Sequence, residues 1–287
     1  ESDVTVLRLG PDKFLIVSGS AQAVHDADWI GSNMPKDAHA VLTDVTSAFA
    51  VLALMGPKSR EILARVTSTD LTNAAFPFAS NRQIDIGYAT ALANRMTYVG
   101  ELGWELFVPT EFAVDVYQTL HDAGSDHGLE DGGYYALEAL RIEKGYRAWS
   151  RELTPDITPW QAGLSFAVKL DKKDGFIGRD ALVAAREKPL GRRILQFTLD
   201  DAMPQLWGGE LILRDGRPVG EVRSGAFGHT LGRSVALGMV QNEGGVDAAF
   251  IAGGRFSIDL AGQQHIATAH LKPLYDPSSL RVKADAD

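Results

Sequence analysis

The stretch Tyr98–Glu105 reads Tyr-Val-Gly-Glu-Leu-Gly-Trp-Glu. Its two glycines lie between an alternating run that ends at Tyr98 and a second run that continues through Trp104 and Leu106. Because glycine permits the backbone angles of a tight turn, the pattern predicts a strand, a turn and a second strand. Successive side chains alternate across a strand, so Glu105 faces away from Trp104 and Leu106. A carboxylate on that face requires either solvent or a partner, and a ligand is one such partner.

This octapeptide resembles the Tyr-Thr-Gly-Glu-x-Gly-x-Glu signature of the folate-binding aminomethyltransferase family, whose founding member is the T-protein of the glycine cleavage system. In that family the last glutamate of the signature holds the pterin ring of tetrahydrofolate, and its match here is Glu105. A carboxylate suits this role because it accepts two parallel hydrogen bonds from the ring N–H and the exocyclic amine. The alternative is a surface hairpin in which Glu101 and Glu105 are both solvated.

Three more segments resemble motifs of the same family and follow in the family's order. They are Arg141–Tyr146, which reads Arg-Ile-Glu-Lys-Gly-Tyr, Thr158–Leu164, and Ser224–Gly232. The resemblance therefore covers nearly the whole chain, and four ordered motifs are far more specific than one short match.

The same resemblance assigns a catalytic residue, and the basic residues of the barrel supply candidates for a further folate contact. Asp3 falls at the family's catalytic aspartate, where an ionised carboxylate stabilises developing positive charge and accepts a proton. The alternative is an aspartate at a frayed terminus. Arg223, with Arg233 as a second candidate, is the basic residue expected to meet the glutamyl tail of the folate, and a solvated surface charge is the alternative.

The remaining expected folate contacts are Val17, Tyr98 and Phe166. Phe166 falls where the T-protein has a tryptophan that packs on the folate, so an aromatic ring there is suited to stacking on the pterin. Phe166 also belongs to the alternating apolar run Leu164, Phe166, Val168, for which a core position in a strand is the alternative.

Several segments point to one branch of the family. Leu137 and Gly19 stand where the T-protein has an arginine and an asparagine, whereas Arg141–Trp149 and Leu153–Pro159 look like the C-terminal folate domain of dimethylglycine and sarcosine dehydrogenases. In those enzymes a flavin domain oxidises an N-methyl amine, and the folate domain captures the one-carbon unit as methylene-tetrahydrofolate.

The resemblance thus implies tetrahydrofolate as cofactor, a one-carbon amine donor, and a flavin oxidoreductase domain or subunit as partner. FAD is expected only on that other domain, because no Gly-x-Gly-x-x-Gly fingerprint occurs here. A glycine cleavage aminomethyltransferase and a non-catalytic folate-binding module are the alternatives. The chain has no initiator methionine, so we expect that roughly the first quarter of a T-protein-like module precedes Glu1.

Periodicity predicts an α+β region with a mixed sheet backed by helices over residues 1–190 and an all-β barrel over 191–287. The expected strands of the first region include Thr5–Leu9, Phe14–Val17, His39–Leu42 and Phe49–Met55, and its helices include Ala21–Ile30 and Tyr134–Lys144. The barrel is expected because short apolar runs alternate with Asp-Gly, Gly-Gly and Ala-Gly pairs from Arg192 onward.

Composition excludes several classes of function. The 287 residues carry a net charge of −9, which argues against nucleic acid as a partner. No apolar run approaches the roughly 20 residues that span a bilayer, and no signal peptide is visible, so a cytoplasmic protein without a membrane partner is expected. The sequence has no cysteine and its seven histidines lack ligand spacing, so no metal site is predicted.

Overall fold

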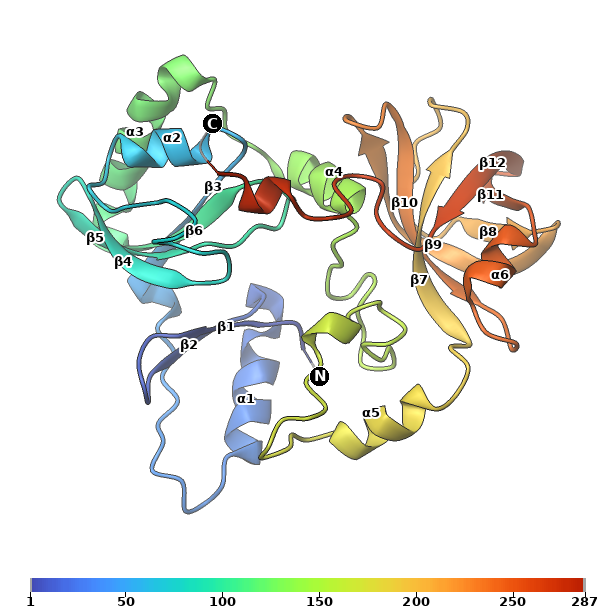
Figure 1. Cartoon of the computed structure of the whole chain (residues 1–287), viewed down its shortest axis with the longest axis horizontal. Helices are drawn as coiled ribbons and strands as arrows, with labels where there is room; N and C mark the ends of the chain where they lie inside the picture. The colour runs from blue at the N-terminus through green and yellow to red at the C-terminus, as the bar shows by residue number, and fades with distance from the viewer. Residues whose placement is uncertain (1, 286–287) are drawn as a thin grey trace. The chain divides into compact units, whose positions relative to one another are not determined.

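The computed structural model, drawn in Figure 1, describes residues 2–285. The chain divides into two compact units. Among the described residues, the hairpin unit comprises Ser2–Gly132 with 278–285, and the barrel unit comprises Gly133–Pro277. The chain therefore leaves the hairpin unit after Gly132 and returns to it at Ser278. The predicted α+β architecture with a C-terminal barrel is confirmed.

A four-stranded antiparallel sheet forms the centre of the hairpin unit. Its strand order is β3 (Phe49–Met55), β6 (Gly103–Pro109), β5 (Ala89–Asn94) and β4 (Asn81–Ile86). Trp104, Leu106 and Val108 alternate along β6 and are fully buried on one face. Figure 1 shows α2 (Ser59–Ala64) and α3 (Ala113–Gly124) on one side of this sheet, and their buried Ile62, Leu63, Val116 and Leu120 belong to the same core.

The hairpin unit begins with a two-stranded ribbon of β1 (Thr5–Arg8) and β2 (Phe14–Val17), followed by η1 (Ser20–Gln22) and α1 (Ala23–Asn33). The strand predicted at His39–Leu42 is wrong. That segment has no regular structure and is exposed, with Val41 88% accessible. The cause is the lack of a partner, since a short apolar run becomes a strand only where a neighbour supplies hydrogen bonds and a surface to pack against.

In the barrel unit, six strands close on one another in the order β10-β7-β12-β11-β8-β9. They are β7 (Arg192–Leu199), β8 (Leu211–Arg214), β9 (Arg217–Gly228), β10 (Arg233–Gln241), β11 (Phe256–Leu260) and β12 (Gln263–His270). Inward-facing Leu195, Phe197, Val222, Ala236 and Ile258 fill the interior. The helical elements of this unit are α4 (Tyr134–Lys144), η5 (Ser165–Ala167), α5 (Arg179–Arg186) and α6 (Ala248–Ala252), and those left in the hairpin unit are η2 (Thr46–Ala48), η3 (Thr110–Phe112), η4 (Ser125–His127) and η6 (Arg281–Lys283).

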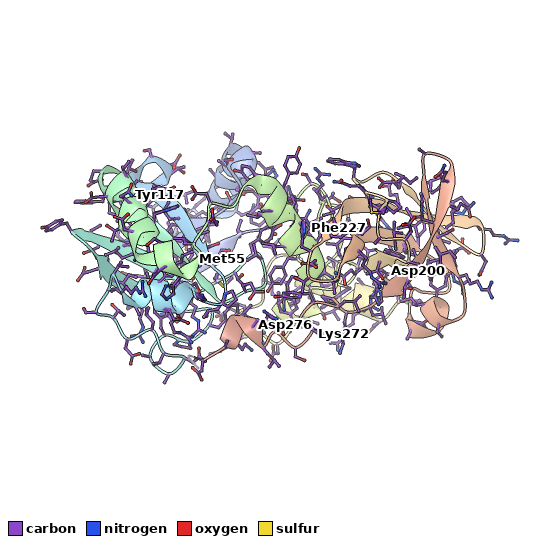
Figure 2. The ribbon with its side chains drawn as sticks, turned by 90° about the horizontal axis from the view of Figure 1, so that it is seen from above. Met55, Tyr117, Asp200, Phe227, Lys272 and Asp276 are labelled. Carbon is purple, nitrogen blue, oxygen red and sulfur yellow. The ribbon has the colours of Figure 1, made fainter. Side chains whose placement is uncertain are left out.

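Helix α4 carries three buried charged residues, of which Arg141 and Lys144 form ion pairs and Glu143 accepts from the backbone N–H groups of Thr230 and Leu231. It ends where predicted, at Gly145, whose φ of +72° suits glycine. The fully buried guanidinium of Arg141 lies 3.0 Å from Glu152, and Lys144 lies 3.0 Å from the carboxylate of Asp276, which is labelled in Figure 2. The Arg-Ile-Glu-Lys-Gly motif therefore has a structural role here, because it fastens α4 to its own unit.

The last eight described residues, 278–285, form a returning segment that completes the hairpin unit. Val282 is 2% exposed. The guanidinium of Arg60 donates to the carbonyl of Ala284 at 2.8 Å, and the Asn73 amide donates to the carbonyl of Lys283 at 2.9 Å. Arg60 of α2 and Asn73 in the loop that follows thus bind a segment that lies more than 200 residues away in sequence.

Candidate functional site

The signature hairpin, residues 89–109, differs in one respect from the sequence prediction. Strand β5 ends at Asn94, so the prediction of a strand up to Tyr98 and a tight turn is wrong, and residues 95–102 form a longer loop. The cause is local. The Thr97 hydroxyl accepts hydrogen bonds from the backbone N–H groups of Val99 (3.2 Å) and Gly100 (3.1 Å), which compete with strand pairing.

The end of this loop is fixed against β3 by close backbone packing. Gly103 pairs with Met55, the last residue of β3, which is labelled in Figure 2. A Cβ atom on Gly103 would lie 2.6 Å from the carbonyl oxygen of Leu54, so a larger side chain would displace backbone. The carbonyl of Leu102 also accepts from the Ser59 hydroxyl at 3.0 Å. The second glycine of the signature is thus required by packing.

Glu105 lies on the face of β6 opposite Trp104, as predicted. Its side chain is half-buried, and its Oε2 accepts a hydrogen bond of 3.1 Å from the amide of Asn94 on β5. On the opposite edge of β6, Glu105 pairs with the exposed residue Ala53 of β3. Val51, two residues before Ala53 on the same strand, is 52% exposed. A carboxylate has about four acceptor positions. With one filled by Asn94, this group retains the capacity to take two further N–H donors, so it fits the pterin-binding role.

Glu101 has a different environment from Glu105. It is the fourth residue of the signature, its side chain is only 14% exposed, and its carboxylate lies 3.8 Å from the guanidinium of Arg281 in the returning segment. The alternative of two solvated glutamates on a surface hairpin therefore does not describe this turn. Glu101 faces a cation of the same unit, whereas Glu105 accepts from an amide on a sheet face that is exposed at Ala53 and Val51 of β3.

Asp3 lies between two fixed points of the hairpin unit. The Ser2 hydroxyl donates to the carboxylate of Asp26 on α1 at 3.0 Å, and Thr5 pairs with Val17 across the β1–β2 ribbon. The alternative of a frayed position is not supported, because its neighbours on both sides are held. The residue is exposed, yet partial burial of its carboxyl raises the pKa of Asp3 above its ordinary value. Such a carboxylate is a stronger base than a fully solvated one.

The predicted catalytic residue and the predicted folate contacts come from both units. The hairpin unit carries Asp3, Val17, Tyr98 and Glu105, and the barrel unit carries Phe166 and Arg223. Val17 and Tyr98 are half-buried. Within the hairpin unit, Val17 of β2 pairs with Thr5 of β1, the strand that follows Asp3. Tyr98 lies in the loop of residues 95–102, which precedes Glu105 on β6.

In the barrel unit, Phe166 is 78% exposed and lies in η5, so its predicted alternative as a core residue of a strand is wrong. The loop makes a 3-10 turn there, which removes the alternation of faces. Its stacking role stays a prediction. Arg223 of β9 lies 3.0 Å from Glu221, and Arg233 begins β10 at an exposed position. Their contact with a glutamyl tail also stays a prediction.

Sequence reasoning missed Asn94. An asparagine at the end of an alternating run gives no signal by itself, because only the register of β5 against β6 shows that it faces Glu105. Two hollows of about 570 Å³ and 270 Å³ belong to the barrel unit and contain none of the predicted site residues. Within residues 2–285, no three His, Asp or Glu side chains gather as a metal site would require. The same residues include no helix long and apolar enough to cross a membrane.

Comparison with solved structures shows the same fold in the aminomethyltransferase T of the glycine cleavage system from Bartonella henselae. The two align with a TM-score of 0.79 at 24% identity, over 96% of this chain and 72% of that one. The likeness supports the fold described above.

Two curated relatives align over almost the whole chain. Human mitochondrial sarcosine dehydrogenase is 37% identical over 99% of this chain and 32% of its own length. Mouse mitochondrial dimethylglycine dehydrogenase is 35% identical over 99% of this chain and 32% of its own length. The chain thus spans about a third of the length of these relatives.

Two family models match the chain in succession. The GCVT N-terminal domain matches residues 1–172, and the glycine cleavage T-protein C-terminal barrel domain matches residues 192–276. The second match contains all six strands of the barrel. The chain therefore belongs to the glycine cleavage T-protein family.

Proposed function

We propose that this chain is a tetrahydrofolate-dependent one-carbon transfer module that captures the product of N-methyl amine oxidation as methylene-tetrahydrofolate. The single observation that carries the proposal is Glu105. It is a half-buried carboxylate at the last position of the signature, fixed by one amide and open to further donors. When bound, tetrahydrofolate supplies the amine nitrogen that takes up the one-carbon unit.

The proposed role of Glu105 is to orient the pterin. An ionised carboxylate accepts the ring N–H and the exocyclic amine in parallel, which fixes both the position and the plane of the ring. Because β6 is an internal strand of its sheet, with β3 on one side and β5 on the other, the carboxylate is held on a rigid element. Sites on rigid strands give more accurate positioning than sites on loops.

The proposed role of Asp3 is to accept the proton that the reacting amine nitrogen loses. Partial burial raises the pKa of this carboxyl, which increases its strength as a base. The negative charge also favours the positive charge that develops on the amine during transfer. No covalent nucleophile is needed for this chemistry, and the chain has no cysteine.

The nature of the amine donor is proposed from the relatives. Both curated relatives named above are dehydrogenases of N-methylated glycines and are about three times longer than this chain. We propose that the donor is of the sarcosine or dimethylglycine type and that a flavin oxidoreductase domain or subunit delivers the oxidised one-carbon unit. Tetrahydrofolate and the amine-derived unit are then the two small molecules that this chain handles.

Calorimetric titration of the 287-residue chain with tetrahydrofolate, followed by an assay of methylene-tetrahydrofolate formation from formaldehyde, tests the proposal. We expect saturable binding and a transfer rate above that of the uncatalysed reaction. Absence of binding would overturn the proposal. Binding without any rate enhancement would leave a folate-binding module and remove the enzymatic claim.

The glycine cleavage reaction is distinguished by a separate assay. An aminomethyltransferase of that system releases ammonia from an aminomethylated lipoyl carrier in the presence of tetrahydrofolate. We expect no release by this chain, since Leu137 and Gly19 depart from the T-protein pattern. Ammonia release at a rate matching formaldehyde capture would assign the chain to that reaction instead.

A further inference from the structure

Asn94 is the residue through which β5 contacts the Glu105 carboxylate. The two residues are direct cross-strand partners in the β5–β6 pair, and the Asn94 Nδ2 donates to Glu105 Oε2 at 3.1 Å. Asn94 is 3% exposed, so its amide is held by its surroundings as well as by the strand. Within residues 2–285, Asn94 is the residue whose side chain donates a hydrogen bond to the Glu105 carboxylate, and the structure shows no second donor.

The chemistry of the pair fixes the orientation of the Asn94 amide. An ionised carboxylate only accepts hydrogen bonds, so the NH₂ group and not the carbonyl of the amide must face it. This contact occupies one acceptor position on Oε2 and restricts rotation of the carboxylate about its last torsion, which is otherwise broad.

We propose that Asn94 is the positioning residue for Glu105 and sets the plane in which the Glu105 carboxylate meets the pterin. This inference rests on the proposed function. A bidentate contact needs both oxygens to lie in the plane of the two ligand N–H groups, so a freely rotating carboxylate loses affinity. Asn94 acts through Glu105 and does not itself need to touch the folate.

Two substitutions separate positioning from simple packing. Asn94→Leu keeps a buried side chain of similar size but removes the donor. Asn94→Asp keeps the shape and replaces the amide by a carboxyl group next to the Glu105 carboxylate. Two carboxylates at this separation repel when both are ionised, but a shared proton lets one donate to the other. The aspartate variant should therefore recover its positioning function as the pH falls.

Asn81 provides a matched control. It is the cross-strand partner of Asn94 on β4, so it lies on the same face of the sheet but one strand farther from Glu105. Its amide donates to the backbone carbonyl of Arg8 at 3.4 Å and makes no contact with Glu105. Asn81→Asp introduces the same charge on the same face without the contact.

The experiment is a calorimetric titration of the 287-residue chain with 5-formyltetrahydrofolate, a stable folate, at several pH values from 5.5 to 8. Circular dichroism first confirms that each variant is folded. Relative to the parent at each pH, we expect Asn94→Leu to bind about 10-fold more weakly at every pH. Asn94→Asp should bind about 30-fold more weakly at pH 8 and approach the parent at pH 5.5. Asn81→Asp should stay within about 2-fold throughout.

The possible outcomes distinguish this inference from the function on which it rests. If the parent binds 5-formyltetrahydrofolate and both Asn94 variants bind equally well at pH 8, Asn94 is not a positioning residue. If the ratio for Asn94→Asp does not change with pH, or if Asn81→Asp follows the same profile, the direct contact is not the cause. A parent that binds no folate at any pH overturns the proposed function, and this inference with it.

Discussion

The guanidinium of Arg95 lies over the ring of Trp104, 5.7 Å from its centroid, on the face of the β5–β6 pair opposite Asn94 and Glu105. Both residues are fully buried. Burial and the neighbouring Arg60 cation lower the pKa of Arg95, and the Asp285 carboxylate opposes this effect. One face of the signature hairpin is therefore buried, with Arg95 packed on Trp104, and the other face carries the Glu105 carboxylate.

The returning segment is expected to stabilise the hairpin unit because it supplies acceptors to buried cations. Arg60 donates to the carbonyl of Ala284 at 2.8 Å, and Arg95 donates to that of Val282 at 3.4 Å. Truncation after Pro277 removes both acceptors and exposes the site of Val282. We expect a loss of about 3–5 kcal/mol in the unfolding free energy of this unit.

Differential scanning calorimetry checks this prediction, with Lys283→Ala as the control. That exposed side chain can be removed while the backbone carbonyl remains in place to accept from Asn73. The truncated chain should show an earlier transition, whereas Lys283→Ala should unfold within about 1 °C of the parent. Equal transitions for the truncated and parent chains would show that the segment is not part of the folded unit.

Gly103 is expected to be intolerant of any side chain. The Cβ of an alanine would lie 2.6 Å from the carbonyl oxygen of Leu54, a backbone atom that cannot move without shifting β3. We expect Gly103→Ala to lower the unfolding free energy by about 2–4 kcal/mol in a denaturant titration. Gly132→Ala, where nothing lies within 4 Å of the added atom, should change it by less than about 0.5 kcal/mol. Similar effects from both would contradict the packing argument.

Much of the fold was predictable because it depends on local pattern. The helix at Tyr134–Lys144 was predicted from its periodicity and from the glycine that ends it, and the strands of the barrel from alternation between turn pairs. The strand at His39–Leu42 failed because its existence depends on a neighbour that the sequence does not reveal. The domain boundary placed at residue 190 stays a prediction.

The candidate site was predictable only in part, and for a physical reason. Glu105 belongs to the signature motif and lies on a strand, so the alternation of side chains was enough to predict which face of the sheet it occupies. Asn94 contacts Glu105 because of the register between β5 and β6. Arg281 lies near Glu101 because the returning segment, far away in sequence, packs on this unit. No local pattern encodes such contacts. The roles of Asp3, Val17, Tyr98, Phe166 and Arg223 stay predictions.

Asp3 is expected to affect transfer and not folate binding. Asp3→Asn removes the base, so the rate of methylene-tetrahydrofolate formation should fall by about 100-fold or more, while the dissociation constant for folate changes by less than about 3-fold. Because burial raises the pKa of Asp3, the parent's rate should decline as the pH falls through a pKa that lies above the ordinary value of an aspartate. A pH–rate profile measured at saturating folate checks this. A variant with the parent's rate, or with an unchanged acid limb, would remove Asp3 from the mechanism.

If the Glu105 carboxylate holds the pterin, Glu105→Gln should bind tetrahydrofolate much more weakly than the parent does. Glutamine replaces one acceptor by a donor that faces a ligand N–H. The loss of a charge-assisted pair and the resulting mismatch should cost about 2–4 kcal/mol, or roughly 30-fold to 1000-fold in affinity. Glu101→Gln is the matched control, since that carboxylate faces Arg281 in the same turn.

Calorimetric titration of the parent, Glu105→Gln and Glu101→Gln with tetrahydrofolate measures these affinities. We expect a large loss of tetrahydrofolate affinity for Glu105→Gln and a change in affinity below about 3-fold for Glu101→Gln. Without ligand, the melting temperatures of both variants should lie within about 2 °C of the parent's. Parent-like binding by Glu105→Gln together with a large loss for Glu101→Gln would show that the signature has been misassigned between its two glutamates. Parent-like binding by both variants would contradict the claim that this hairpin binds folate.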